Sequence, residues 1–153
     1  MSKLSHYDDA GTPRMVDVGA KAETRRTAKA HAFVRMSKEV LAALPANPKG
    51  DPLGVARVAG VLAAKKTADL IPMCHSLPLS YADVDMVMEA EGIRVTATAA
   101  TSAQTGVEME ALTAVTVAAL TIYDMTKALD KRISIEDVYL LEKTGGKSGD
   151  FHR

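Results

Sequence analysis

The sequence predicts an α+β sandwich, an antiparallel sheet with its helices packed on one face. Three segments that alternate small or apolar with polar side chains indicate strands, and the turn "AEG" joins two of them. Two longer segments rich in alanine and apolar at helical spacing indicate helices. A length of 153 residues with 47% hydrophobic and 25% charged side chains is ordinary for one globular domain.

Alternation and helix caps define the elements in the first half. Arg26–Met36 alternates and is predicted to be a strand. Ser37 can cap a short helix over 38–44, which two prolines then end. Asp51 can cap a second helix that starts with a proline and runs through 52–70.

The second half starts with a predicted antiparallel hairpin, formed by Tyr81–Glu89 and the strand that begins at Ile93. The motif "TGVE" (105–108) has the form of a capping box, so a helix is expected over 106–129, about 36 Å long at 1.5 Å per residue. A last strand is predicted over 134–142.

The order of these elements is strand, helices, strand, strand, helix, strand. A ferredoxin-like sandwich is the closest standard arrangement. Residues 1–13 are polar and contain glycine and proline, so they are expected to form a flexible tail. Residues 14–153 are expected to form one domain, since no linker or internal repeat divides them.

The charge balance and the single cysteine argue against some classes of protein. Nineteen basic and nineteen acidic side chains give no net charge, which argues against nucleic-acid binding. One cysteine allows no intrachain disulfide. The beginning of the sequence has no apolar signal region, and the uncharged run 111–123 is too short to span a bilayer. A cytoplasmic protein without membrane contact is therefore expected.

The stretch "IPMCHSLPLS" (71–80) is predicted to be a stiff loop, because its two prolines oppose a helix or a strand. It carries Cys74 and His75. A thiol nucleophile would need a base within reach, and a zinc site would need more ligands than this sequence supplies. A rigid wall that presents His75 to a ligand and a structural loop with a buried cysteine both remain open.

Acidic and basic residues mark the two ends of the long predicted helix. Glu110 and Asp124 point in directions about 40° apart but lie about 21 Å apart along the axis. No charge separates them, so the helix is expected to be buried on most sides, in an oligomer with a pocket between subunits. Asp124 with Lys127 can also be a surface ion pair, and Glu108 the partner of Thr105 in the capping box.

The glycine-rich segment "GGKSG" (145–149) is not a phosphate-binding P-loop, because the required first glycine is Leu141 and no helix follows. A flexible loop whose amides and Lys147 hold a phosphate and a mobile tail both fit it.

Six motifs in collinear order resemble the MoaC family: "MVDVGAKAETRR" (15–26), "KGD" (49–51), "DLIPMCH" (69–75), "TGVEMEALTA" (105–114), "ALTIYDMTKA" (119–128) and "KTGGKSGDF" (143–151). The resemblance implies cyclic pyranopterin monophosphate synthesis, a step of molybdenum cofactor biosynthesis. The substrate would be 3′,8-cyclo-7,8-dihydroguanosine triphosphate, with diphosphate released. The resemblance also implies a cytoplasmic homohexamer, a trimer of dimers with active sites between subunits. It implies that no redox cofactor takes part. A role for a divalent ion at the phosphates stays open.

The resemblance also implies roles for single residues. Asp124, Lys127 and Lys49 match the catalytic acid–base positions. The positions implied to contact substrate are Met73, Cys74, His75, Met109, Glu110, Glu108, Arg26 and Lys147, of which Arg26 and Lys147 suit a triphosphate. Ser76 stands where the family usually has proline, which puts the pose of His75 in question. A non-catalytic purine- or pterin-binding oligomer and a thiol enzyme are the alternatives.

Overall fold

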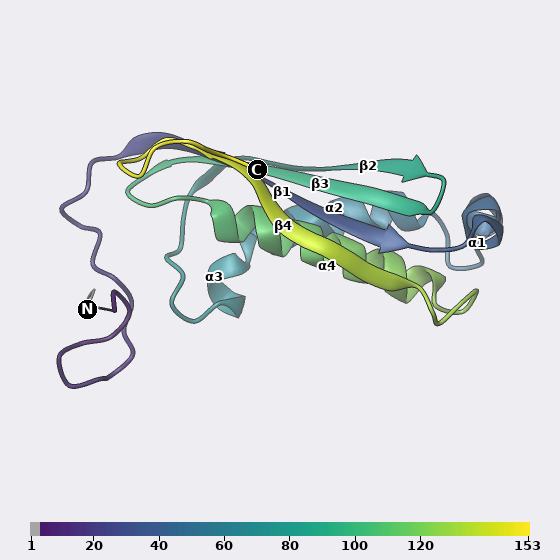
Figure 1. The fold of residues 1–153 in the computed structure, drawn as a ribbon, viewed down its shortest axis with the longest axis horizontal. Coiled ribbons are helices and arrows are strands. Elements are labelled where there is room, and N and C mark those ends of the chain that lie inside the picture. Colours follow the sequence, from purple (N-terminus) through teal and green to yellow (C-terminus); the bar gives the residue numbers. More distant parts are fainter. Residues whose placement is uncertain (1–3) are drawn as a thin grey trace.

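The computed structural model describes residues 4–153, so residues 1–3 of the predicted tail lie outside the described residues. Its strands form one antiparallel sheet in the order β2-β3-β1-β4-β5 (Figure 1). The strands are β1 (Thr24–Arg35), β2 (Leu79–Glu89), β3 (Gly92–Ala103), β4 (Ser134–Thr144) and β5 (Phe151–His152). The first four have the strand order of the ferredoxin-like fold, which confirms the predicted class.

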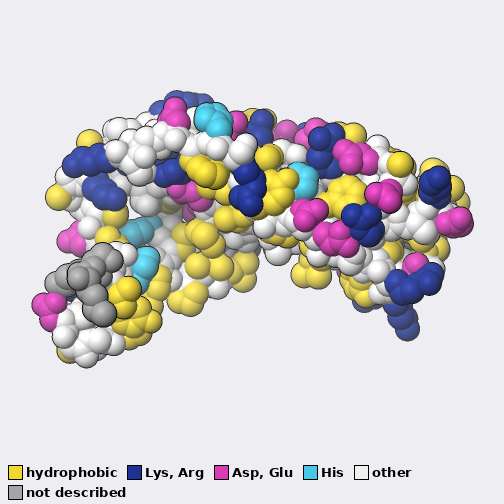
Figure 2. All heavy atoms as spheres, viewed as in Figure 1, with side chains coloured by type: hydrophobic (Ala, Val, Ile, Leu, Met, Phe, Trp, Pro, Cys, Tyr) yellow, Lys and Arg dark blue, Asp and Glu magenta, His cyan; other side chains and the backbone are white. Residues whose placement is uncertain are grey.

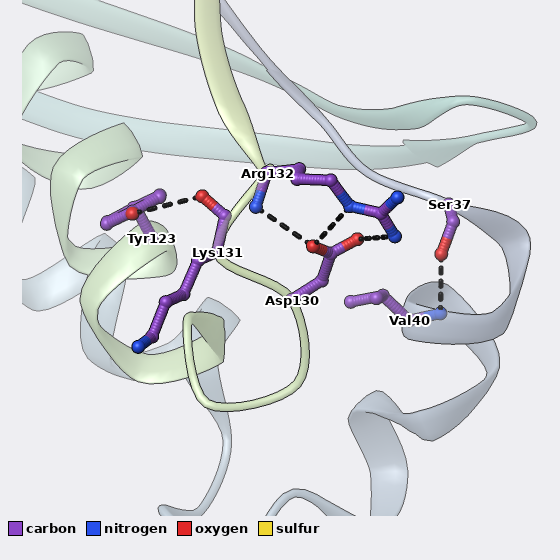
Figure 3. Close-up of polar contacts among 6 residues, drawn as sticks. All are labelled: Ser37, Val40, Tyr123, Asp130, Lys131 and Arg132. Carbon is purple, nitrogen blue, oxygen red and sulfur yellow. Dashed lines mark hydrogen bonds and ion pairs between the residues drawn. The ribbon is translucent and has the colours of Figure 1, made fainter.

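The helices are α1 (Lys38–Ala43), η1 (Leu44–Ala46), α2 (Pro52–Lys65), α3 (Thr67–Leu70) and α4 (Glu108–Thr126). α2 and α4 lie side by side and cover one face of the sheet (Figure 1). Two predicted caps are confirmed. Ser37 Oγ accepts from the Val40 amide at 3.2 Å (Figure 3), and Asp51 Oδ1 accepts from the Leu53 amide at 3.0 Å. These local bonds explain why both helix starts could be placed from sequence.

Two helix predictions were wrong in detail. α4 starts at Glu108 after Val107, which makes no side-chain cap bond, so Thr105 and Glu108 do not form the expected capping box. The predicted helix over 52–70 is divided at Lys66 into α2 and α3. There the Thr67 hydroxyl donates to the carbonyl oxygens of Ala63 and Ala64, at 3.1 and 3.0 Å, and so satisfies acceptors that a continuing helix would use.

The core between sheet and helices is built from small side chains. Most of its alanines are fully buried, and the two helices can therefore approach each other and the sheet closely. Gly60 in α2 marks the closest approach: a Cβ there would lie 2.6 Å from Val84 Cγ2 and 3.0 Å from the Ala114 carbonyl oxygen. Any larger residue must displace β2 or α4, so α4 has little freedom to shift.

A compact turn joins α4 to β4. The Asp130 carboxylate accepts from the Arg132 amide at 2.9 Å and from its guanidinium at 3.0 and 3.1 Å (Figure 3). The Tyr123 hydroxyl donates to the Lys131 carbonyl oxygen at 3.3 Å (Figure 3). The turn therefore ties the last part of α4 to the chain that follows it.

The glycine-rich segment forms a hairpin loop between β4 and β5, a strand that sequence analysis missed. The Gly145 amide donates to Asp150 Oδ1 at 3.1 Å, and Lys143 Nζ donates to Ser148 Oγ at 2.6 Å. Gly145 has φ +88°, and a Cβ there would lie 2.3 Å from the Arg25 carbonyl oxygen, so only glycine fits this close approach.

Candidate functional site

A hollow of about 450 Å³ lies where the N-terminal arm (residues 4–23) meets the body of the molecule. The arm extends from the body at the left of Figure 1, and Figure 2 shows the surface hollowed beside it. The loop between α3 and β2 forms one wall. The lining residues are Ser5, His6, Val16, Val18, Lys21, Ile71, Met73, Cys74, His75, Leu77, Thr105, Gly106, Glu108 and Met109.

The wall carries the predicted residues Met73, Cys74 and His75. It begins with a turn closed by the Cys74 amide, which donates to the Ile71 carbonyl oxygen at 3.1 Å. His75 Nε2 lies 2.6 Å from the Val16 carbonyl oxygen and so links the wall to the arm. Ser76 is exposed and does not line the hollow. The loop therefore holds His75 at the hollow in the absence of the usual proline.

Glu110 lies beneath this wall, and only 3% of its surface is exposed. Cys74 Sγ donates to its Oε1 at 3.8 Å, whereas its Oε2 is buried without a hydrogen-bond partner among the described residues. Burial raises the pKa of Glu110, and the neighbouring charge of Glu108 adds to this rise. Burial also raises the pKa of Cys74 to about 11, with the charge of Glu110 as the next cause. The thiol is consequently a protonated donor at neutral pH rather than a nucleophile.

Glu108 and Met109 lie at the rim of the hollow, at the start of α4. The carboxylate of Glu108 forms an ion pair with Lys143 from β4, with Nζ and Oε1 3.5 Å apart. Met109 is exposed. Thus the first turn of α4 presents two side chains to the hollow, Glu108 and Met109, and buries a third, Glu110.

A second hollow, of about 480 Å³, gathers positive charge. Its lining includes Lys21, which also lines the first hollow, together with Arg26 and Lys147. Arg26 is fixed from β1, because its guanidinium donates to the carbonyl oxygens of Ala103 and Gln104 at 3.0 and 3.2 Å. The two hollows are neighbours, and together they offer a wall for a ring system next to cations suited to phosphates.

Asp124, Lys127 and Lys49 form a separate cluster at the other end of α4. Lys127 Nζ lies 2.8 Å from Asp124 Oδ1, and Lys49 Nζ donates to the Asp124 carbonyl oxygen at 3.0 Å. The hydrogen bond from Lys127 lowers the pKa of Asp124, and the same bond raises the pKa of Lys127. Both side chains are about half exposed. The cluster is thus a charged pair in water, with a second lysine held beside it.

One chain does not unite these two groups of residues. Both residues lie in α4, and fourteen residues at 1.5 Å each place Asp124 about 21 Å beyond Glu110 along its axis. Cys74, Met73, His75, Met109, Glu108, Arg26 and Lys147 gather at the Glu110 end. The sequence-based expectation that one copy of the helix cannot bring Glu110 and Asp124 to one small substrate agrees with this arrangement.

Sequence reasoning missed the contribution of the arm. Lys21 and Val16 both lie within the matched motif 15–26, so that motif was the available signal for them, but no pattern pointed to His6. Among residues 4–153, no group of three or more His, Cys, Asp and Glu side chains could hold a metal ion. No helix in the described part of the chain is long and apolar enough to cross a membrane.

Comparison with known proteins places these residues in a family context. The model of the MoaC family matches residues 15–146. A cyclic pyranopterin monophosphate synthase from Novosphingobium aromaticivorans is 59% identical over 151 residues, which are 97% of this chain and 96% of the relative. Synthases of the same name from Deinococcus radiodurans and Corynebacterium glutamicum are 58% and 54% identical, over 97% and 99% of this chain and 89% and 98% of theirs.

Proposed function

The chain belongs to the MoaC family and is a cyclic pyranopterin monophosphate synthase of molybdenum cofactor biosynthesis, and we propose that two copies of the chain complete each active site. The enzyme is a lyase that converts 3′,8-cyclo-7,8-dihydroguanosine 5′-triphosphate into cyclic pyranopterin monophosphate and diphosphate. The observation that carries the proposal is the placement of two partial sites at opposite ends of α4, about 21 Å apart.

The outward face of α4 has the character of an interface with a second copy of the chain, which would complete the active site. Met109, Thr116 and Leu120 are exposed on it, and α4 carries no charge between Glu110 and Asp124. Figure 2 shows apolar side chains along the lower edge of the molecule, where Figure 1 places the helices. An antiparallel copy of α4 centred near Val117 would set its Asp124 opposite Glu110, because these residues are equally distant from that centre.

A second apolar surface supports further assembly into the proposed homohexamer, a trimer of dimers. Val55, Val58 and Leu62 are exposed on α2 at 48%, 69% and 51%. They follow helical spacing and form one stripe on the solvent side of the helix layer. Light scattering is expected to give six times the 16.2 kDa chain mass, and a stable, active monomer would contradict both interfaces.

Proton transfers are assigned to the Asp124 end. Opening the guanine-derived five-membered ring and rebuilding it as a pterin requires protons to be moved to and from nitrogen and oxygen. Asp124 is charged and can accept a proton, whereas Lys127 and Lys49 carry protons that they can donate. In one chain the ion pair lowers the pKa of Asp124 and raises that of Lys127. Burial against the partner would move both pKa values back toward the working pH.

The triphosphate is assigned to the second hollow. Closing the cyclic phosphate with loss of diphosphate builds negative charge on the leaving group, which Arg26, Lys147 and Lys143 can stabilise. The ring system is assigned to the first hollow, against Met73, Cys74, His75, Glu108 and Met109, with Glu110 buried beneath this wall. We propose that no redox cofactor takes part and that the enzyme acts in the cytoplasm. Turnover that persists after exhaustive chelation would support the absence of a metal requirement.

Incubation of the purified protein with the cyclised substrate tests the function. The expected result is cyclic pyranopterin monophosphate and diphosphate in equal amounts, detected by mass spectrometry and a phosphate assay. The Asp124→Asn variant should bind substrate and form little product. Tight binding without product from the wild-type protein would instead favour a non-catalytic pterin-binding oligomer, and a covalent adduct on Cys74 would favour a thiol enzyme.

A further inference from the structure

The contact between His75 and the arm has a chemical consequence for the imidazole ring. Its Nε2 lies 2.6 Å from the Val16 carbonyl oxygen, within hydrogen-bond distance. Gln104 Nε2 donates to the Gly19 carbonyl oxygen at 3.4 Å, three residues further along the same segment. Val16 and Val18 are half-buried and line the hollow, whereas Asp17 between them is exposed. Two side chains of the body thus hold an extended segment of the arm against the hollow.

A carbonyl oxygen has lone pairs and no proton, so the nitrogen that faces it must carry the hydrogen. His75 is therefore held with its proton on Nε2. In a neutral imidazole the other nitrogen then has no proton and can only accept. No described residue forms a hydrogen bond with His75 Nδ1. The ring consequently keeps one acceptor that residues 4–153 leave unused.

We infer that Val16 is a positioning residue: its carbonyl oxygen fixes the Nε2–H tautomer of His75, so that Nδ1 serves as the proton acceptor toward the substrate. A substrate N–H or O–H group would transfer its proton to Nδ1, and the imidazolium would keep its Nε2–H bonded to Val16. The carbonyl dipole then stabilises the positive charge that the ring acquires. The inference rests on the proposed function, because it takes His75 to contact the ring system of the substrate.

Histidine NMR tests the tautomer without any measurement of activity. The protein is labelled with ¹⁵N at its four histidines, and each signal is assigned from the spectrum of the corresponding single His→Gln variant. In the neutral imidazole of His75, the expected spectrum has the proton on Nε2. A proton on Nδ1 would overturn the inference. His31→Gln is the matched control, since His31 stacks on Tyr139 4.6 Å away and does not line the hollow, and should leave the His75 signals unchanged.

Two substitutions separate the anchoring of the arm from proton transfer. In His75→Gln the side-chain amide nitrogen can take the place of Nε2 and still donate to Val16, but Nδ1 has no equivalent. In His75→Asn the shorter side chain loses the bond to Val16. Hydrogen exchange at the amides of residues 14–18 should stay within about twofold of wild type in His75→Gln and rise at least about tenfold in His75→Asn. Equal exchange in the two variants would contradict the role of Val16.

Turnover gives the functional half of the test. Both variants are expected to lower kcat by roughly 10², because each lacks a ring nitrogen that can accept the proton. The wild-type protein could have the Nε2–H tautomer while both variants keep the wild-type kcat. That result would reject the proton-acceptor role of His75 and leave the rest of the synthase assignment intact. Loss of all product in the wild-type enzyme would instead reject the proposed function itself.

Discussion

The two ends of α4 place the same kind of side chain in opposite environments. Glu110 is buried beneath the wall of the first hollow, and burial raises its pKa. Asp124 is exposed beside Lys127, and the bond to that lysine lowers its pKa. Desolvation therefore favours the protonated acid at one end, and a cation favours the carboxylate at the other. Pairs of acids whose pKa values are driven apart can divide proton donation and acceptance between them.

Substitutions at the exposed end of α4 are expected to have the largest effect on kcat. Asp124→Asn and Lys127→Ala should each lower kcat by roughly 10² or more, the usual scale for an acid–base group. Thermal unfolding should be nearly unchanged, because an exposed ion pair adds little stability. Glu89→Gln is the matched control: Glu89 forms a similarly exposed ion pair with Arg94, 3.0 Å away on the β2–β3 hairpin, and its loss should leave kcat unchanged. If both substitutions change kcat only slightly, Asp124 and Lys127 are a surface ion pair without a catalytic role.

Mixed oligomers test whether the two ends meet across an interface. Glu110→Gln and Lys127→Ala subunits, each expected to be strongly impaired alone, should regain activity after exchange, since about a quarter of the sites would receive both intact residues. A mixture of Asp124→Asn with Lys127→Ala is the control and should show no rescue, because both changes affect the same end of α4. Exchange proven by mass spectrometry without rescue in the first mixture would mean that Glu110 and Lys127 serve different sites.

Stability as a function of pH should sharpen the contrast at the buried end. The folded pKa of Glu110 lies above its ordinary value of 4.5, so the stability that protonated Glu110 contributes is complete below that value and is lost as pH rises through the folded pKa. Glu110→Gln removes this loss, so its stability relative to wild type should increase as the pH rises above 4.5. Urea unfolding at constant protein concentration measures this, and parallel pH profiles would contradict it.

Cys74→Ser should have the smallest effect. The serine hydroxyl can donate to Glu110 as the thiol does, so kcat should stay within about threefold of wild type. In the wild-type protein the alkylation rate of Cys74 should keep rising through the ordinary thiol pKa of 9.0 and level off near 11, because the reactive thiolate forms only there. A rate that levels near 9 would show that the thiol is not desolvated.

Local patterns in the sequence predicted most of the fold. The caps at Ser37 and Asp51 and the β2–β3 hairpin depend on residues near one another in the chain, and all were placed correctly. The capping box failed because α4 begins at Glu108 itself, so Glu108 is not the third helical residue after a Thr105 cap. Its carboxylate instead pairs with Lys143, thirty-five residues away, whose position depends on β4. Likewise, the burial of Glu110 and the bond between Val16 and His75 arise from tertiary docking. The distance between the two partial sites could be predicted from helix geometry alone.

Because α4 packs closely at Gly60, its length determines how far apart the functional residues at its two ends lie. α4 cannot slide along α2 without moving Gly60 against Ala114, so the distance between its ends is fixed by the number of residues it contains. One inserted residue would turn everything beyond it by about 100° and advance it by about 1.5 Å. Asp124 and Lys127 would then leave the face they share with Leu120. The number of residues in α4 therefore decides whether Asp124 of one copy lies opposite Glu110 of the other. Variation in this protein should be tolerated in loops long before it is tolerated in the length of α4.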